Sequence, residues 1–320
     1  MKRRTFLNKS LAVGAIPILE LKSIKKLKSI HLSDVWNTKI KIERIQRPLK
    51  ILQISDTHIS LHEDTETKYL EFSERMGKAY QNIKHYKTGE ESSPAKCFKD
   101  LMKLAVSEKV DLLALSGDLV NYPSEKDVAF VLDEVKATGI PHIYTAGNHD
   151  WHYEGLKGSA NSLRDEWCKS ILKPLYSGDI YASSSIFNGI NCVMIDNSTY
   201  QVNEQQLDFF IHQTKKSEPV ILFVHIPIFV PGMKMCCGHP EWGAANDKNY
   251  KLERREPWAK EGNSKSTLDF LKTVYNAPNL IGVFCGHIHR YETSTYKNMT
   301  QYAAMPGLNG QYRLIELESL

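Results

Sequence analysis

The sequence lacks an apolar run long enough to cross a membrane and contains little cysteine. A transmembrane helix needs roughly 20 predominantly apolar residues, and no stretch approaches that length, which excludes a polytopic membrane protein. Six cysteines in 320 residues, without a CxxC pair, give no sign of a zinc ribbon or a redox couple. Internal repeats and low-complexity tracts are absent. A hydrophobic content of 42% with 10% aromatic residues excludes global disorder.

An excess of positive charge is also missing once the N-terminus is set aside. The chain has 41 basic and 37 acidic residues, and residues 1–30 hold eight of the basic residues and one of the acidic ones. The remainder therefore has 33 basic and 36 acidic residues, a net charge of −3. Such a body offers no electrostatic reason to expect nucleic acid as a partner. Composition alone predicts a soluble globular protein and nothing more specific.

The first 30 residues have the layout of an export leader. Lys2, Arg3 and Arg4 precede a short apolar stretch at 11–19. The pair Arg3-Arg4 followed by Thr5-Phe6-Leu7 resembles the bacterial twin-arginine signal, which exports proteins that are already folded. This resemblance implies Tat-type export machinery as a partner, a periplasmic location, and removal or disorder of residues 1–30. An ordinary basic, disordered N-terminus is the alternative, because no clean small-x-small cleavage site follows the apolar stretch.

From residue 40 onward, short β-branched runs alternate with amphipathic helical patterns. This alternation predicts an α/β fold and a single domain over residues 40–320. Strands are expected at Ile40–Ile45, Leu49–Ile54, Asp111–Leu115, His142–Thr145, Asn191–Ile195, Val220–Val224 and Leu280–Phe284. Helices are expected at Pro94–Glu108, Ser124–Gly139, Asn203–Lys215 and Ser266–Asn276.

Two segments interrupt this alternation and are expected to be insertions. The first, near 61–92, has aromatic and apolar residues at helical spacing, namely Tyr69, Phe72, Met76, Tyr80 and Ile83. The second, near 227–263, is far longer than a usual connection and holds Trp242, Tyr250 and Trp258. Long ordered loops of this kind serve as lids or substrate-recognition elements, or are surface elaborations, and the sequence leaves these alternatives open.

Metal-competent side chains follow five of the expected strands, each at the point where the strand ends. They are Asp56 and His58; Asp118; Asn148, His149 and Asp150; His225; and His287 with His289. Groups at the carboxyl ends of strands in an open α/β sheet converge in one crevice, so these side chains are expected to form one site. A mixture of carboxylate, amide and imidazole ligands suits Mn, Fe or Zn better than an all-oxygen Mg or Ca site.

The spacing within these motifs also favours a metal site. Asp56 with His58, and His287 with His289, are two positions apart, so extended backbone projects both members of each pair to one side. Glycines 117, 147 and 286 stand where a Cβ is expected to clash with the site. Asp118 has two carboxylate oxygens and suits a ligand shared by two ions. Two ions about 3.5–4 Å apart can hold a shared hydroxide and clamp the oxygens of a phosphoryl displacement.

The complete motif series resembles that of the calcineurin-like metallophosphoesterases. Asp-x-His, Gly-Asp, Gly-Asn-His-Asp, His and Gly-His-x-His occur in this order over roughly residues 48–290. The resemblance implies a two-sheet β-sandwich flanked by helices. It implies that Asp56, His58 and His289 bind one ion, that Asn148, His225 and His287 bind the other, and that Asp118 bridges them. His149 would stabilise the transition state or protonate the leaving oxygen, and Asp150 would orient it.

The same resemblance implies hydrolysis of a small phosphoester by a hydroxide bridging two divalent ions, Mn, Fe or Zn. It leaves open whether the substrate is a monoester or a diester. The purple acid phosphatase branch has a tyrosine ligand where this chain has Asn121, so a purple ferric site is not expected. The alternatives are a catalytically silent binding or scaffold protein on the same fold, against which the complete ligand set counts, and a nuclease of the same family, against which the charge of −3 counts.

Overall fold

A computed structural model describes residues 26–61, 67–242 and 262–320. Most of the predicted leader lies outside these residues. So do residues 62–66 of the first predicted insertion and residues 243–261 of the second, which include Tyr250 and Trp258. Within the described part of the chain, no helix combines the length and apolar character needed to span a membrane.

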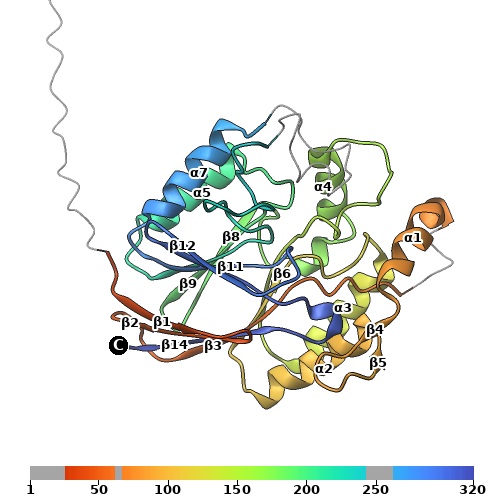
Figure 1. Ribbon diagram of the computed structural model, residues 1–320, viewed down its shortest axis with the longest axis horizontal. Coiled ribbons are helices and arrows are strands. Elements are labelled where there is room, and N and C mark those ends of the chain that lie inside the picture. The colour runs from red at the N-terminus through yellow and green to blue at the C-terminus, as the bar shows by residue number, and fades with distance from the viewer. Residues whose placement is uncertain (1–25, 62–66, 243–261) are drawn as a thin grey trace, which may run out of the picture.

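Two six-stranded mixed sheets form the centre of the fold (Figure 1). The first has the order β1-β2-β14-β3-β6-β7 and the second the order β12-β13-β11-β10-β9-β8. The first sheet consists of β1 (Ser29–Ser33), β2 (Asn37–Ile42), β3 (Leu49–Ile54), β6 (Leu112–Ser116), β7 (His142–Thr145) and β14 (Arg313–Ser319). The second consists of β8 (Ala182–Phe187), β9 (Ile190–Ile195), β10 (Val220–Phe223), β11 (Leu280–Cys285), β12 (Glu292–Tyr296) and β13 (Met299–Ala303).

The two sheets pack face to face. Successive side chains along a central strand point alternately toward the other sheet and toward the covering helices. Leu112 and Ala114 of β6 face the second sheet and share a core cluster with Phe223 and Phe284. The intervening Leu113 points to the opposite side, into the cluster formed with the helices. Strands buried on both faces read as continuous apolar runs, which is why the sequence predicts them well. The predicted two-sheet sandwich is confirmed.

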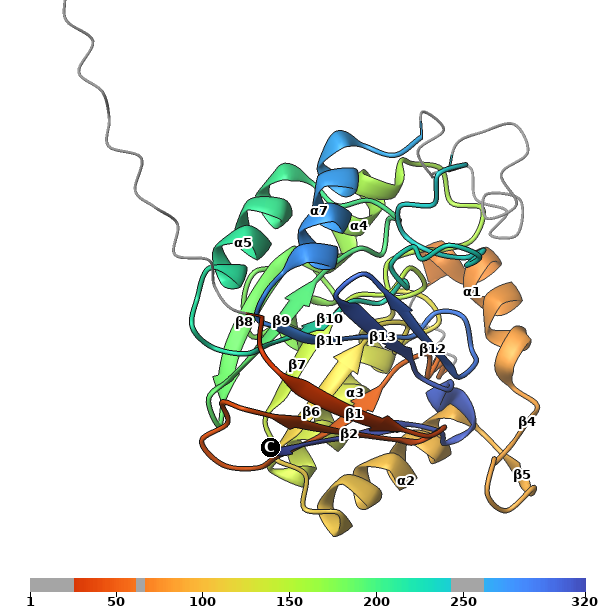
Figure 2. The same cartoon turned by 60° about the vertical axis from the view of Figure 1, so that its left-hand side comes forward.

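Helices cover the outer faces of both sheets (Figures 1 and 2). They are α2 (Pro94–Ser107) and α3 (Glu125–Thr138) on the first sheet, α5 (Glu204–Thr214) and α7 (Lys265–Asn276) on the second, and α4 (Ala160–Lys169) near one end. Capping residues mark the ends of these helices. Ser93 accepts a hydrogen bond from the backbone of Lys96 at the start of α2, and Gly139 ends α3 with a φ of 67°.

The insertion near 61–92 is only partly helical. It contains α1 (Leu70–Gly77), a 3₁₀ turn at Lys78–Tyr80, and a small hairpin of β4 (Ile83–Lys84) and β5 (Glu91–Ser92). The predicted helical spacing therefore holds as far as Tyr80 and fails at Ile83, which pairs with Ser92 instead.

Candidate metal centre

The carboxyl ends of parallel strands from both sheets meet at one place. In the first sheet, β3, β6 and β7 run parallel, and in the second, β9, β10 and β11 do. Backbone hydrogen bonds join neighbouring ends: the Asp56 N–H donates to the Gly117 carbonyl at 2.9 Å, and the Gly286 N–H donates to the His225 carbonyl at 2.9 Å. The two sheets are joined here as well, since Gln53 Nε2 donates to the Cys285 carbonyl at 3.1 Å. The predicted ligand-bearing segments are thereby brought together.

Asp56, His58 and His289 form the first group of potential ligands, with ligand atoms within 4.8 Å of one another. His289 Nε2 lies 3.3 Å from Asp56 Oδ1 and 3.0 Å from His58 Nε2. The Asp56 carboxylate also accepts the backbone N–H of His287, which fixes its orientation. Asp56 and His58 are fully buried, and the buried Nδ1 of His58 has no hydrogen-bond partner among the residues that the structure describes.

Asp118, His225 and His287 form the second group, and all three are buried. His225 Nε2 lies 3.2 Å from Asp118 Oδ2, while its Nδ1 donates to the Ser116 carbonyl at 2.9 Å. Asp118 also forms a third group with His58 and His149, so its carboxylate lies between the other two groups. Asn148 is buried at the end of β7, next to His149. Oxygen and imidazole nitrogen donors in this arrangement fit two divalent ions.

Most of the predicted ligands have an uncommon backbone conformation. Among the described residues, nine that are not glycine have a positive φ, and five of them are predicted ligands. These five are Asp56 (57°), His58 (45°), Asp118 (52°), His287 (69°) and His289 (50°). The left-handed region costs an L-residue about 1–2 kcal/mol, and such strain persists where surrounding contacts enforce it. The Asp-x-His and His-x-His pairs are therefore not on extended backbone as predicted, and the fold is strained at the residues expected to hold ions.

Three glycines permit this close approach of chains. A Cβ on Gly147 would lie 2.2 Å from Asp118 Oδ1, and one on Gly286 would lie 1.8 Å from Ser55 Oγ. Gly117 has a φ of 90°, and a Cβ there would lie 2.5 Å from His225 Nδ1. The predicted clash at each of these positions is confirmed, because any side chain would displace a residue of the site.

Electrostatic interactions within the cluster favour the metal-binding protonation states of Asp118 and His58, but they hold a proton on His225 that an ion must displace. Burial opposes ionisation of Asp118, but the nearby His225 and His149 hold its pKa well below the usual value. Burial, together with the charge of His149, lowers the pKa of His58 well below its usual value and keeps that ring neutral. Burial also opposes a charge on His225, yet Asp118 raises its pKa to about 10. Ionised carboxylates and a neutral His58 are the forms that bind metals.

Asp150 does not orient His149, and that prediction is wrong. Its carboxylate accepts the backbone N–H groups of Gly147, Asp118 and Val120 at 2.8–2.9 Å, and the Tyr144 hydroxyl at 2.9 Å. These contacts use both oxygens of the carboxylate, and none of them is with the His149 ring. Burial, followed by the charge of Asp118, raises the pKa of Asp150 to about 7. Asp150 therefore holds the Gly117–Asp118 and Gly147–Asn148 turns together.

Asn121 occupies the place predicted for Asp150. Its Oδ1 lies 3.1 Å from His149 Nδ1, and its Nδ2 donates to the Met76 carbonyl at 2.8 Å. The sequence showed only that this position lacks the tyrosine of the purple enzymes. The contact with His149 depends on how β6 and β7 lie side by side, which the motif spacing does not reveal.

Tyr80, from the insertion near 61–92, covers part of the cluster. Its ring stacks on His58 with centroids 4.4 Å apart and an interplanar angle of 19°. It also lies 6.5 Å from the His149 ring and 6.4 Å from the His289 ring. The helical spacing of the insertion placed Tyr80 on an apolar face but gave no signal for this contact with the site.

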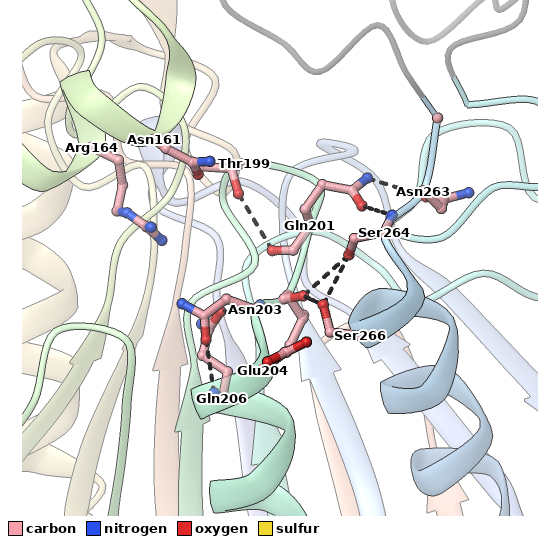
Figure 3. Close-up of a pocket in the computed structure, with 12 residues that line it drawn as sticks. Asn161, Arg164, Thr199, Gln201, Asn203, Glu204, Gln206, Asn263, Ser264 and Ser266 are labelled. Carbon is pink, nitrogen blue, oxygen red and sulfur yellow. Dashed lines mark hydrogen bonds between the residues drawn. The ribbon is translucent and has the colours of Figure 1, made fainter.

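A polar cavity of about 440 Å³ lies apart from the metal-ligand cluster (Figure 3). Residues of α4, of the 199–203 segment and of the starts of α5 and α7 line it, and none is a predicted ligand. Its polar side chains bind one another: Gln201 pairs with Asn263 and with the Ser264 backbone, and Arg164 pairs with Asp196 at 3.2 Å. The potential metal ligands lie in the cluster, and none of them lines this cavity.

Comparison with known proteins agrees with the geometry. The model of the calcineurin-like phosphoesterase family matches residues 49–291. The chain belongs to this family. It is accordingly a hydrolase acting on phosphoester bonds. The family depends on two metal ions, and the groups of potential ligands described above could hold metals.

Individual relatives are distant. A probable cyclic nucleotide phosphodiesterase of Fibrobacter succinogenes is 25% identical over 80% of this phosphoesterase chain and 79% of its own. A probable cyclic nucleotide phosphodiesterase of Psychrobacter arcticus is 24% identical over 80% of this chain and 78% of its own length. A dimetal phosphatase from Danio rerio has a similar structure, with a TM-score of 0.52 at 14% identity over 83% of this chain and 91% of that chain. The last likeness concerns the fold.

Proposed function

We propose that this phosphoesterase uses two divalent ions, Mn, Fe or Zn, to hydrolyse a small phosphodiester. The observation that carries the proposal is the Asp118 carboxylate, which lies between the two groups of potential ligands with His225 Nε2 at 3.2 Å and His58 Nε2 at 3.9 Å. Asp56, His58 and His289 would hold one ion, and Asn148, His225 and His287 the other, with Asp118 shared. When bound, the ions supply Lewis acidity and an activated water for attack on phosphorus.

His149 is proposed to act on the leaving oxygen. The ring is half-buried and lies beside the cluster, with its centroid 4.6 Å from that of His58. A hydrogen bond from Nδ1–H to Asn121 Oδ1 holds the ring in place and leaves Nε2 as the nitrogen that exchanges a proton. The protonated ring can donate to an oxygen that develops negative charge, as a general acid does.

The diester preference is proposed from the two curated relatives, both named probable cyclic nucleotide phosphodiesterases. We expect metal-stripped protein to be inactive, and protein reconstituted with Mn²⁺, Zn²⁺ or Fe²⁺ to hydrolyse bis-aryl phosphate and cyclic nucleotides faster than aryl monophosphate. Initial rates on the same panel, with metal content measured in each preparation, provide the check. A monoester preference would overturn the diester assignment. Protein that holds two ions and hydrolyses nothing would instead favour the silent scaffold.

Export by the twin-arginine route is proposed from the leader. Because that route depends on the arginine pair, the double substitution Arg3→Lys and Arg4→Lys should retain the protein in the cytoplasm while leaving the net charge unchanged. Fractionation of a bacterium that expresses the full chain measures this, with Lys2→Arg as the control. Equal periplasmic amounts of the double variant and the unaltered chain would refute the proposal.

A further inference from the structure

We propose that Tyr200 is a positioning residue that holds His287 in the orientation and tautomer needed to bind an ion. The Tyr200 hydroxyl lies 2.6 Å from His287 Nε2. A hydrogen bond from Nε2–H to this oxygen keeps the proton on Nε2 and leaves the lone pair of Nδ1 for an ion. The proposal rests on the two-ion site of the proposed function and adds a residue outside the five sequence motifs.

The place of Tyr200 in the fold supports this role. It follows β9, which runs parallel to β10, so its segment leaves the second sheet at the edge where the ligands converge. The ring is fully buried, stacks on Trp242 with centroids 4.5 Å apart, and meets the His287 ring edge-on at 5.4 Å. Stacking on one side and the imidazole on the other leave the hydroxyl little freedom to move.

The backbone of Tyr200 is held in an uncommon conformation. Its φ is 61°, in the left-handed region where glycine is the usual residue. The Tyr200 N–H donates to the Asn197 carbonyl at 2.8 Å, and the Tyr200 carbonyl accepts the Cys237 thiol at 3.3 Å. Residues with such a strained backbone are found mostly at functional sites.

The turn that carries Tyr200 is also anchored to the segment of the other imidazole ligand. The Asn197 side chain donates to the Ile226 carbonyl at 2.6 Å and accepts the Ile226 N–H at 3.0 Å, next to His225 in the chain. On its other side, Gln201 binds the start of α7 through Asn263 and Ser264 (Figure 3). One turn thus connects His225, His287 and α7.

His225 shows the same arrangement with a different partner. Its Nδ1 donates to the Ser116 carbonyl, which leaves Nε2 facing Asp118. Metal-binding histidines commonly donate their second ring N–H to an oxygen, which fixes the tautomer and the ring orientation. Tyr200 is the oxygen partner of His287, as Ser116 is of His225.

The test is the substitution Tyr200→Phe, which keeps the ring and its stacking and removes the hydroxyl. We expect the affinity for the second ion to fall about 10- to 100-fold while the first ion binds as before. Titration of metal-stripped protein with Zn²⁺ or Mn²⁺ against a chromophoric chelator measures both steps without a substrate. The matched control is Tyr302→Phe, which removes a buried hydroxyl lying 2.7 Å from His31 Nδ1, a histidine that is not a predicted ligand.

The outcomes separate this proposal from the proposed function. Unchanged affinity in Tyr200→Phe, or an equal loss in Tyr302→Phe, overturns the positioning role even if the enzyme hydrolyses diesters. Failure of the unaltered protein to hydrolyse any ester with two ions bound refutes the function and leaves the positioning role standing. Histidine ¹⁵N spectra of the unaltered, zinc-loaded protein test the tautomer directly: a proton on His287 Nε2 supports the proposal, and a proton on Nδ1 overturns it.

Discussion

The substitution Asp118→Asn should lower hydrolysis by roughly a thousandfold or more, because several kcal/mol of charge stabilisation depend on the ions that Asp118 would share. Asparagine keeps the shape of the side chain and can still accept a hydrogen bond from the backbone N–H of His149, whose nitrogen lies 2.7 Å from Asp118 Oδ1. It removes the negative charge and the second strong oxygen ligand. Steady-state rates together with metal content per chain provide the measurement, and both should fall.

The matched variant for this test is His149→Ala. It removes an imidazole from the same cluster without removing a ligand of the proposed two-ion set, so hydrolysis should fall about 10²- to 10⁴-fold while both ions stay bound. Retention of both ions and full activity in Asp118→Asn would show that the reaction centre lies elsewhere. Loss of an ion in His149→Ala would make His149 a ligand, in line with its place in the group with His58 and Asp118.

The substitution Asp150→Ala should destabilise the folded protein by about 3 kcal/mol or more, in addition to any effect on activity. Three buried backbone N–H groups and the Tyr144 hydroxyl donate to this carboxylate, and each buried donor left without an acceptor costs about 1–3 kcal/mol. Denaturant unfolding monitored by circular dichroism measures the change.

Tyr144→Phe is the graded control, because it removes one of these four donors and leaves the carboxylate in place. Its effect on the free energy of unfolding should be smaller than that of Asp150→Ala. If Asp150→Ala instead keeps its stability and loses only activity, the carboxylate acts on the chemistry and the earlier expectation that Asp150 orients His149 is restored.

The parts of the fold that the sequence predicted are those with strong apolar patterns. Central strands such as β6 and β9 are buried on both faces, so their residues form continuous hydrophobic runs. The edge strands β8 and β12 have the sequences ASSSIF and ETSTY, in which polar residues interrupt or replace the apolar run, and they were not predicted. They are strands because they pair with β9 and β13. The residue pattern within one segment does not reveal such pairing.

The candidate site divides in the same way. The ligands could be named because each follows a strand within two to four positions, so strand direction alone gathers them. The partners of those ligands could not be named, because they depend on tertiary contacts. Asp150 stands next to His149 in sequence but binds the backbone of its own turn and of the turn after β6. Asn121 and Tyr200, by contrast, reach His149 and His287 from other segments.

The origin of the ligands in both sheets has a consequence for assembly during synthesis. Asp56 and Asp118 emerge from the ribosome well before His287 and His289, which follow β11 near the end of the chain. A nascent chain lacking β11 can offer only part of either coordination set, so tight loading must wait until nearly the whole polypeptide has docked. Ions that bind the native state alone then stabilise it by mass action. Metal occupancy would thereby report that β11 has joined the second sheet and that the sandwich has closed.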